Sequence, residues 1–145
     1  MYSKKYMLAY GMNTNLNSMR WRCPQARSLG KVTLKDHKLA FRTFCDAVIE
    51  PGANIECALW EITDICEMSL DALEGYPNFY GKKEVTVDYN GRKIRAMIYY
   101  MKDRHAVAPP SQQYLDTVAD GYDDHDMDLT QLVDALEELA ECLSY

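Results

Sequence analysis

Residues 84–101 read EVTVDYNGRKIRAMIYYM, and this stretch predicts a β-hairpin. Val85 and Val87 alternate with polar residues, which is the period of a strand with one buried face. Asn90-Gly91 comes next, and both central residues of a type I′ turn need a positive φ, which Asn and Gly adopt readily. The chain then returns over residues 92–101, so we expect two antiparallel strands here.

More strands are expected upstream of this hairpin. Residues 6–10 read as a strand that leads into a loop containing Gly11 and Asn13. Pro51-Gly52 is a turn signal, since Pro presets φ and Gly accepts a positive φ. Short strand candidates are residues 31–34 and 38–41, which flank Asp36-His37, and residues 47–50 and 55–62, which flank the Pro-Gly turn.

Helices are marked by capping residues. Asp64 with Glu67 three residues later resembles a capping box, and we expect this helix to stop at Gly75. Ser111 can cap a second, short helix that is closed by Gly121.

A third helix completes the pattern at the C-terminal end. Asp128 with Gln131 caps it, and its apolar residues follow helical spacing while acidic residues take the opposite face. Most strands therefore precede most helices, without a regular βαβ alternation. We expect an α+β fold in which a small mixed, largely antiparallel β-barrel is flanked by helices.

The bulk properties narrow the function class. A length of 145 residues suits one core, so we expect residues 1–145 to form a single domain. The net charge of −6 argues against a nucleic-acid partner, because such a surface needs clustered Lys and Arg. No apolar run approaches the ~20 residues of a membrane helix, and the N-terminal apolar stretch ends at Gly11, too early for a signal peptide. We expect a cytoplasmic protein with no membrane partner.

The cysteines indicate no disulfide framework. Their number is odd, no CxxC occurs, and no pair has zinc-ligand spacing; they are Cys23, Cys45, Cys57, Cys66 and Cys142. We expect reduced, mostly buried thiols. The three histidines give no recognisable pairing with a nucleophilic cysteine.

Two segments are candidates for a small-molecule site. In Tyr10-Gly11-Met12-Asn13, the glycine lets a backbone approach a ligand, and successive N–H groups can form an anion-binding concavity. Glu74 lies between an apolar helix face and a Gly-Tyr-Pro break, where partial desolvation would raise its pKa toward that of a general base. The plain alternatives are an ordinary strand-ending turn and a solvated glutamate in a last helical turn.

Aromatic residues offer further candidates. Eleven tyrosines are present, and most are expected in the core or the barrel wall with a wet hydroxyl. One or two could orient a polar substrate; the set is Tyr76, Phe79, Tyr80, Tyr99, Tyr100 and Tyr114.

An acidic segment, residues 120–128, contains a histidine at position 125. It does not fit the calcium-loop pattern, and one histidine is a weak ligand set. We expect a solvated loop ahead of a capped helix and no metal site.

Taken in order, these segments resemble the γ-glutamylcyclotransferase-like (AIG2-like) family. Residues 10–15 (YGMNTN), Met19, residues 22–26 (RCPQA) and Gly30 are similar to its opening pattern of YGSNLN, M, RCP-x-A and G. Residues 59–63 (LWEIT) and 70–80 (LDALEGYPNFY) match LWEIT and LDxxEGYPxxY. Residues 96–101 look like its next strand, and residues 110–125 like its closing helix. The resemblance spans nearly the whole chain, and the two main segments at this separation are fairly specific.

The resemblance implies a compact barrel with a cavity at one end and an intramolecular aminolysis. A γ-glutamyl amine or γ-glutamyl amino acid is the implied substrate, and 5-oxoproline and a free amine are the products. Glu74 is the implied general base, and no metal or organic cofactor is implied. Substrate-binding positions carried over by motif are Tyr10, Gly11, Met12, Asn13, Tyr80 and Tyr114.

Two departures from the family pattern leave alternatives open. Met12 stands where the family usually has Ser, and Thr14 stands where it usually has Leu. If the Ser acts through its backbone, Met12 is tolerable; if its hydroxyl contacts substrate, a polar contact is lost. A non-catalytic protein that binds a small molecule or a partner in the same cavity is therefore the second hypothesis. A purely structural role for both segments is the third.

Overall fold

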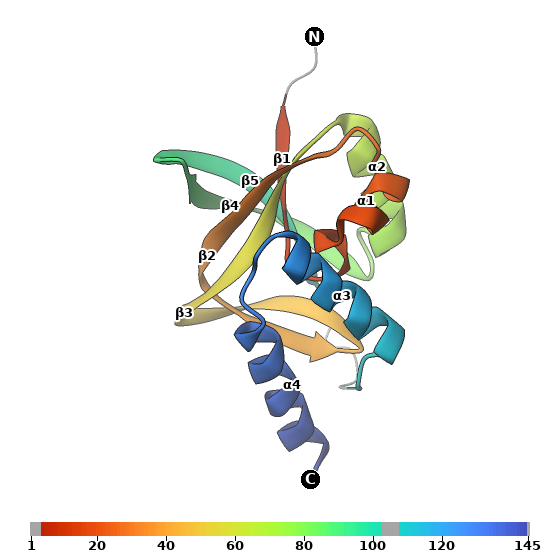
Figure 1. Ribbon diagram of the computed structural model, residues 1–145, viewed down its shortest axis with the longest axis vertical. Coiled ribbons are helices and arrows are strands. Elements are labelled where there is room, and N and C mark those ends of the chain that lie inside the picture. Colours follow the sequence, from red (N-terminus) through yellow and green to blue (C-terminus); the bar gives the residue numbers. More distant parts are fainter. Residues whose placement is uncertain (1–3, 103–107, 145) are drawn as a thin grey trace.

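The computed structural model describes residues 4–102 and 108–144 (Figure 1). Its strands are β1 (Lys5–Ala9), β2 (Arg27–Arg42), β3 (Phe44–Ile62), β4 (Tyr80–Tyr89) and β5 (Arg92–Met101). Its helices are the 3-10 turn η1 (Met12–Thr14), α1 (Leu16–Arg22), α2 (Asp64–Glu74), α3 (Gln112–Asp124) and α4 (Thr130–Leu143).

The strands form one mixed sheet in the order β2-β3-β1-β5-β4. Only the β1–β5 pair is parallel, so the predicted α+β class with a largely antiparallel sheet is confirmed. The two edge strands approach each other, since Lys83 Nζ of β4 lies 2.9 Å from His37 Nε2 of β2. No hydrogen-bonded ladder joins these edges within residues 4–102 and 108–144, so the barrel is an open, curled sheet rather than a closed one.

The β4–β5 hairpin has the predicted turn. Tyr89 pairs with Arg92 across the turn. Asn90 has φ 49° and Gly91 has φ 77°, as a type I′ turn requires.

The Pro51-Gly52 turn prediction is wrong. β3 runs through it as one strand of 19 residues, and β2 is likewise one strand of 16 residues where two were expected. The β2–β3 register shifts between Lys35 and His37, and the extra residues of β3, including Gly52, bulge out of the ladder there. Gly52 N–H donates to Asp36 Oδ1 at 2.9 Å. The turn-forming residues therefore bend a paired ribbon instead of reversing the chain.

The helix ends differ from the predicted caps at several points. Ser111 caps α3 as predicted, its Oγ accepting from Tyr114 N–H. The cap of α2 is Thr63 rather than Asp64, because its Oγ1 accepts from Cys66 N–H. Asp128 accepts from Thr130 N–H at 2.9 Å, but Gln131 bonds Glu56 and Tyr122 instead of completing a capping box.

Gly121 does not close α3, which continues to Asp124. It is buried where α3 crosses the loop after β1, and a Cβ there would lie 2.6 Å from Asn15 N. The expected solvated loop at residues 120–128 is correspondingly wrong in part. Its first half is helical, and His125 is buried against Ser28 and Trp60.

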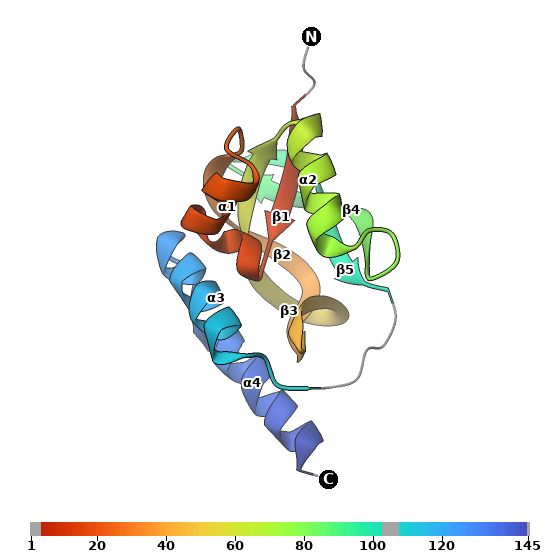
Figure 2. The same cartoon turned by 90° about the vertical axis from the view of Figure 1, so that its right-hand side faces the viewer.

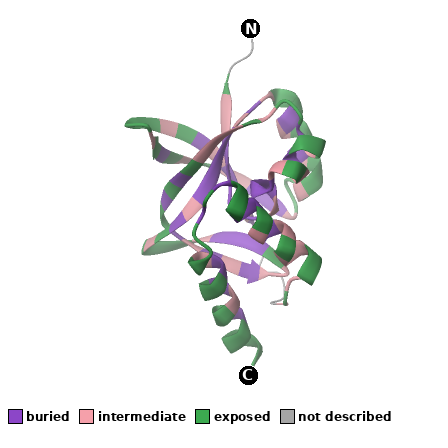
Figure 3. Ribbon diagram, in the orientation of Figure 1, coloured by how far each residue is buried: buried purple, intermediate pink, exposed green. Residues whose placement is uncertain are grey.

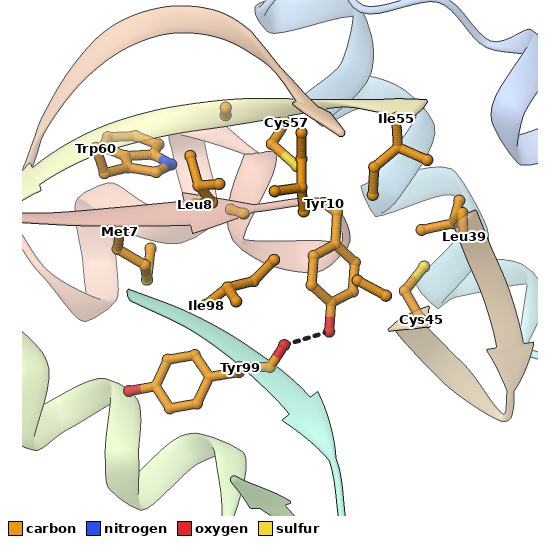
Figure 4. Close-up of a cluster of buried hydrophobic side chains, with 14 of the residues drawn as sticks. Met7, Leu8, Tyr10, Leu39, Cys45, Ile55, Cys57, Trp60, Ile98 and Tyr99 are labelled. Carbon is orange, nitrogen blue, oxygen red and sulfur yellow. Dashed lines mark hydrogen bonds between the residues drawn. The ribbon is translucent and has the colours of Figure 1, made fainter. Parts of the chain in front are cut away.

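The core lies inside the curled sheet (Figures 3 and 4). Strand β1 runs through its centre, and Met7, Leu8 and Ile98 are almost fully buried. Four of the five cysteines are buried, as predicted, and all five are free thiols in this structure. Figure 2 shows β1 between α1 and α2, and residues of both β1 and α2 line the cavity described below. None of the helices in the described part of the chain combines the length and apolar character needed to cross a membrane.

Candidate active site

Glu74 is the last residue of α2, and Gly75 places it. Gly75 takes the left-handed conformation (φ 64°) and ends the helix, with its N–H bonded to the carbonyl of Ala72. The left-handed conformation is sterically unfavourable for residues with a Cβ, which accounts for a glycine directly after Glu74. The turn leaves the Glu74 carboxylate half-buried beside the end of β1.

The loop after β1 forms the facing side of the site. Gly11 O accepts from both the N–H and the hydroxyl of Thr14, which folds residues 12–14 into the turn η1. A Cβ at Gly11 would lie 3.0 Å from Cys45 Cβ and 3.1 Å from Tyr114 Oη. The loop therefore packs this closely only because residue 11 has no side chain.

Asn13 connects the loop to the helix. Its Nδ2 donates to Glu74 Oε1 at 2.9 Å, and its Oδ1 accepts from an Arg22 guanidinium nitrogen at 2.8 Å. Because Arg22 has donors and no acceptor, it fixes which end of the Asn13 amide faces Glu74. A second Arg22 nitrogen lies 3.2 Å from Met12 Sδ, so Met12 is held by the same side chain.

Burial raises the pKa of Glu74, and the Asn13 hydrogen bond and the Arg22 charge offset this only in part. Desolvation likewise lowers the pKa of Arg22, and the charge of Glu74 opposes that shift. A carboxylate with a raised pKa, one oxygen engaged and the other without a protein partner among the described residues, is suited to accept a proton.

These groups face a cavity of about 470 Å³, within the size range of small-molecule sites. All seven residues predicted for the site line it, namely Tyr10, Gly11, Met12, Asn13, Glu74, Tyr80 and Tyr114. Its other walls come from β1, α2, the start of β3, residue 79 and Tyr99.

The tyrosine hydroxyls of the cavity differ in whether they already donate a hydrogen bond to the protein. Tyr10 donates to Tyr99 O at 2.7 Å (Figure 4), and Tyr80 donates to Cys45 O at 2.7 Å. Tyr114 Oη instead accepts from Cys45 N–H at 3.0 Å. No oxygen or nitrogen acceptor for the Tyr114 hydroxyl is found among the described residues, and the neighbouring Cys45 thiol is a weak hydrogen-bond partner. Tyr114 is thus the lining tyrosine with a donor to spare.

The described residues give less support to a catalytic cysteine or to a metal ion. Burial raises the pKa of the Cys45 thiol to about 12, so it is not a thiolate near neutral pH. Residues 4–102 and 108–144 hold no cluster of three or more His, Cys, Asp or Glu side chains that could bind a metal ion.

Sequence reasoning missed three residues of the site. Arg22 stands in the quoted RCPQA segment, but its motif position does not show that it reaches Asn13. Phe44 and Cys45 follow the β2–β3 turn and enter the cavity through the long-range sheet, so no local pattern marks them.

A curled mixed sheet flanked by helices, with a carboxylate facing a glycine loop across one cavity, forms a concave site suited to a small molecule. The family described as "Gamma-glutamyl cyclotransferase, AIG2-like" matches residues 7–122. The chain belongs to this family, which confirms the resemblance drawn from its motifs.

Solved structures support the same assignment. A structure described as "Gamma-glutamyl cyclotransferase" is 25% identical with a TM-score of 0.79, and the match covers 95% of this chain and 87% of that one. An uncharacterized protein from Homo sapiens is 26% identical with a TM-score of 0.76, covering 94% and 86%. YkqA from Bacillus subtilis, at 20% identity and a TM-score of 0.76, shares the fold over 95% of this chain and 55% of its own. No curated protein sequence gives a significant match.

Proposed function

We propose that this protein is a cyclotransferase that converts a γ-glutamyl amine or γ-glutamyl amino acid to 5-oxoproline and a free amine. The substrate's α-amine nitrogen forms a bond to its own γ-carbonyl carbon, and the bond from that carbon to the leaving nitrogen breaks. In becoming the lactam N–H, the α-ammonium loses two protons, and the leaving nitrogen gains two and departs as an ammonium ion. No water, metal or redox partner is consumed.

Glu74 is the general base in this proposal. An α-ammonium is mostly protonated near neutral pH and is no nucleophile until a base acts. The observation that carries the proposal is the half-buried Glu74 carboxylate, held by Asn13 at 2.9 Å and facing the cavity. One well-placed carboxylate typically supplies ~10²–10⁴-fold in rate, and the same group can return the proton to the leaving amine.

The loop after β1 binds the reacting end of the substrate. The N-terminal end of η1 at Gly11 receives no side-chain cap. In this proposal the N–H groups of Met12 and Asn13, together with the hydroxyl of Tyr114, hold the glutamyl head and the oxyanion that develops on the γ-carbonyl. Tyr10 and Tyr80 line the cavity with their rings, because their hydroxyl protons are already bonded to the backbone.

Arg22 and Asn13 are positioning residues. Arg22 sets the Asn13 amide, and the amide occupies one Glu74 oxygen so that the other is directed to substrate. Ring closure is already intramolecular, so holding the substrate folded supplies much of the remaining acceleration.

One experiment tests the proposed function directly. The purified protein is incubated with a panel of γ-glutamyl dipeptides and γ-glutamyl amines, and 5-oxoproline is measured by mass spectrometry. We expect 5-oxoproline from at least one member, in equal amount to the released amine. A protein that binds these compounds without releasing 5-oxoproline is the binding protein of the second hypothesis, and the cyclotransferase proposal is then wrong.

A further inference from the structure

One wall of the cavity is aromatic. Phe44 meets Tyr114 edge-on with ring centroids 5.2 Å apart, and it meets Phe79 edge-on at 6.2 Å. Tyr114 adjoins Gly11, and Phe79 adjoins Gly75, the residue after Glu74. Phe44 therefore bridges the loop side and the Glu74 side of the same cavity.

The wall is apolar and accessible. Phe44 is 39% exposed and Leu73, on the last turn of α2, is 43% exposed, although both line the cavity. Large apolar side chains left open at a concave site indicate a surface that a ligand covers.

The charge of the cavity also favours an apolar ligand. Among the lining residues of the described chain, Glu74 is the only one that carries a charge near neutral pH, and none is Lys, Arg or His. Arg22 is held behind Asn13 and Met12 and is absent from the lining of the cavity. An anionic leaving group would meet no balancing cation among the described lining residues, whereas an apolar one would displace water from the aromatic rings.

We propose that the Phe44–Phe79–Tyr114 wall is the leaving-group subsite, and that it selects γ-glutamyl compounds whose amine carries an aromatic or long aliphatic group and no further negative charge. The predicted substrate preference in turnover rests on the proposed function, whereas the predicted preference in binding does not.

The test compares matched substrates that differ only at the leaving amine. We expect kcat/KM for the γ-glutamyl amide of benzylamine to exceed that of methylamine by about tenfold or more, the size of discrimination an apolar pocket gives. γ-Glutamyl-phenylalanine, whose leaving amine carries a carboxylate, should be poorer than the γ-glutamyl amide of phenethylamine by a similar factor. Equal or reversed ratios overturn the proposal.

Variants show whether a substrate preference comes from the aromatic wall or from the intrinsic reactivity of the leaving amine. Phe44→Ala should lose about tenfold in the benzyl-over-methyl ratio, while Phe44→Leu, which keeps an apolar side chain, should retain most of it. Ile49→Ala removes an exposed apolar side chain of the same strand outside the cavity and should leave the ratio unchanged. A ratio that Phe44→Ala does not move contradicts the assignment.

Calorimetry keeps the two proposals distinguishable. Binding of the benzyl and methyl amides to the Glu74→Gln protein reports the subsite without turnover. Tighter benzyl binding that Phe44→Ala abolishes supports the subsite even if the wild type makes no 5-oxoproline. Turnover of every panel member with no benzyl preference in either assay refutes the subsite and leaves the cyclotransferase proposal standing.

Discussion

The side-chain amide of Asn13 donates to Glu74 Oε1 at 2.9 Å, although 61 positions separate the two residues in sequence. Asn13 lies in the turn after the central strand β1, and Glu74 ends α2, which packs beside that strand. The contact therefore joins the two motif segments into one site, and its geometry depends on Arg22 at the other end of the amide.

Arg22→Met should weaken catalysis without removing any lining residue. The Asn13 amide loses the donor that orients it, so Glu74 is held less firmly, and a displacement of about 1 Å can cost up to about 10²-fold in kcat. The charge of Arg22 lowers the pKa of Glu74, so its loss should also move the acid limb of kcat/KM to higher pH.

Arg20→Met is the matched control for that variant, because Arg20 is exposed on the same helix. It should leave both kcat and the pH profile unchanged. If Arg22→Met has a wild-type kcat and acid limb, Arg22 does not position the base.

Met12→Ser restores the residue usual in the family pattern. It should widen the cavity, and the contact of Met12 Sδ with Arg22 is a weak hydrogen bond whose loss leaves the Arg22–Asn13 bond in place. Turnover of ordinary γ-glutamyl amino acids should hold or rise in steady-state assays. Loss of turnover in a variant that melts like the wild type would instead make Met12 a specificity residue.

The pH profile should carry the signature of Glu74. Burial raises its pKa above the ordinary 4.5, and only the ionised form can take a proton. We expect kcat/KM to fall as pH drops through an apparent pKa above 4.5. An acid limb at or below the ordinary value would show that the catalytic base is not a desolvated carboxylate.

Gly121→Ala tests how the loop is supported. A Cβ there would lie 2.6 Å from Asn15 N and 2.7 Å from the backbone carbon of Thr14, so η1 must shift. Overpacking of this kind typically costs about 1–3 kcal/mol, and the shift should also lower kcat because η1 carries Asn13. Denaturant unfolding and turnover measure the two effects. Asp120→Ala, at the exposed neighbouring position, should change neither much.

Local chemistry predicted the elements whose geometry is local. The Asn90-Gly91 hairpin and the Ser111 cap follow from φ preferences and from one hydroxyl beside free N–H groups. Pro51-Gly52 has equally good turn chemistry, but continuous pairing of β3 with β2 on both sides overrides it. Sheet pairing is a long-range interaction that a short window of sequence does not contain.

The residues of the site likewise fall into those that the sequence predicted and those that it did not. The pairing of the Gly11–Asn13 loop with Glu74 was predictable only because both motif segments resemble one family. Phe44 and Arg22 reach the site through the β2–β3 turn and the packing of α1, and neither has a local signal. Residue type alone also could not show that the Tyr80 hydroxyl donates to a backbone carbonyl while the Tyr114 hydroxyl accepts from a backbone N–H.

Glu74→Gln tests the role of the base while keeping the shape of the site. The amide is nearly isosteric, so the fold should persist. The free energy of unfolding should change in a pH-dependent way, because the folded state binds the Glu74 proton more tightly than the unfolded state. This stabilising term is fully present below pH 4.5 and is lost as pH rises through the raised pKa. The melting temperature of the variant near pH 7 should therefore equal or exceed that of the wild type.

The most direct measurement is the rate of 5-oxoproline release by wild type, Glu74→Gln and Glu67→Gln on the best substrate of the panel. Glu67 lies on the same helix but pairs with Lys5 and Lys82 outside the cavity, so its amide variant should keep wild-type turnover. Glu74→Gln should lose ~10²–10⁴-fold in kcat while still binding substrate. A Glu74→Gln protein that releases 5-oxoproline as fast as the wild type would contradict the assignment of Glu74 as the base.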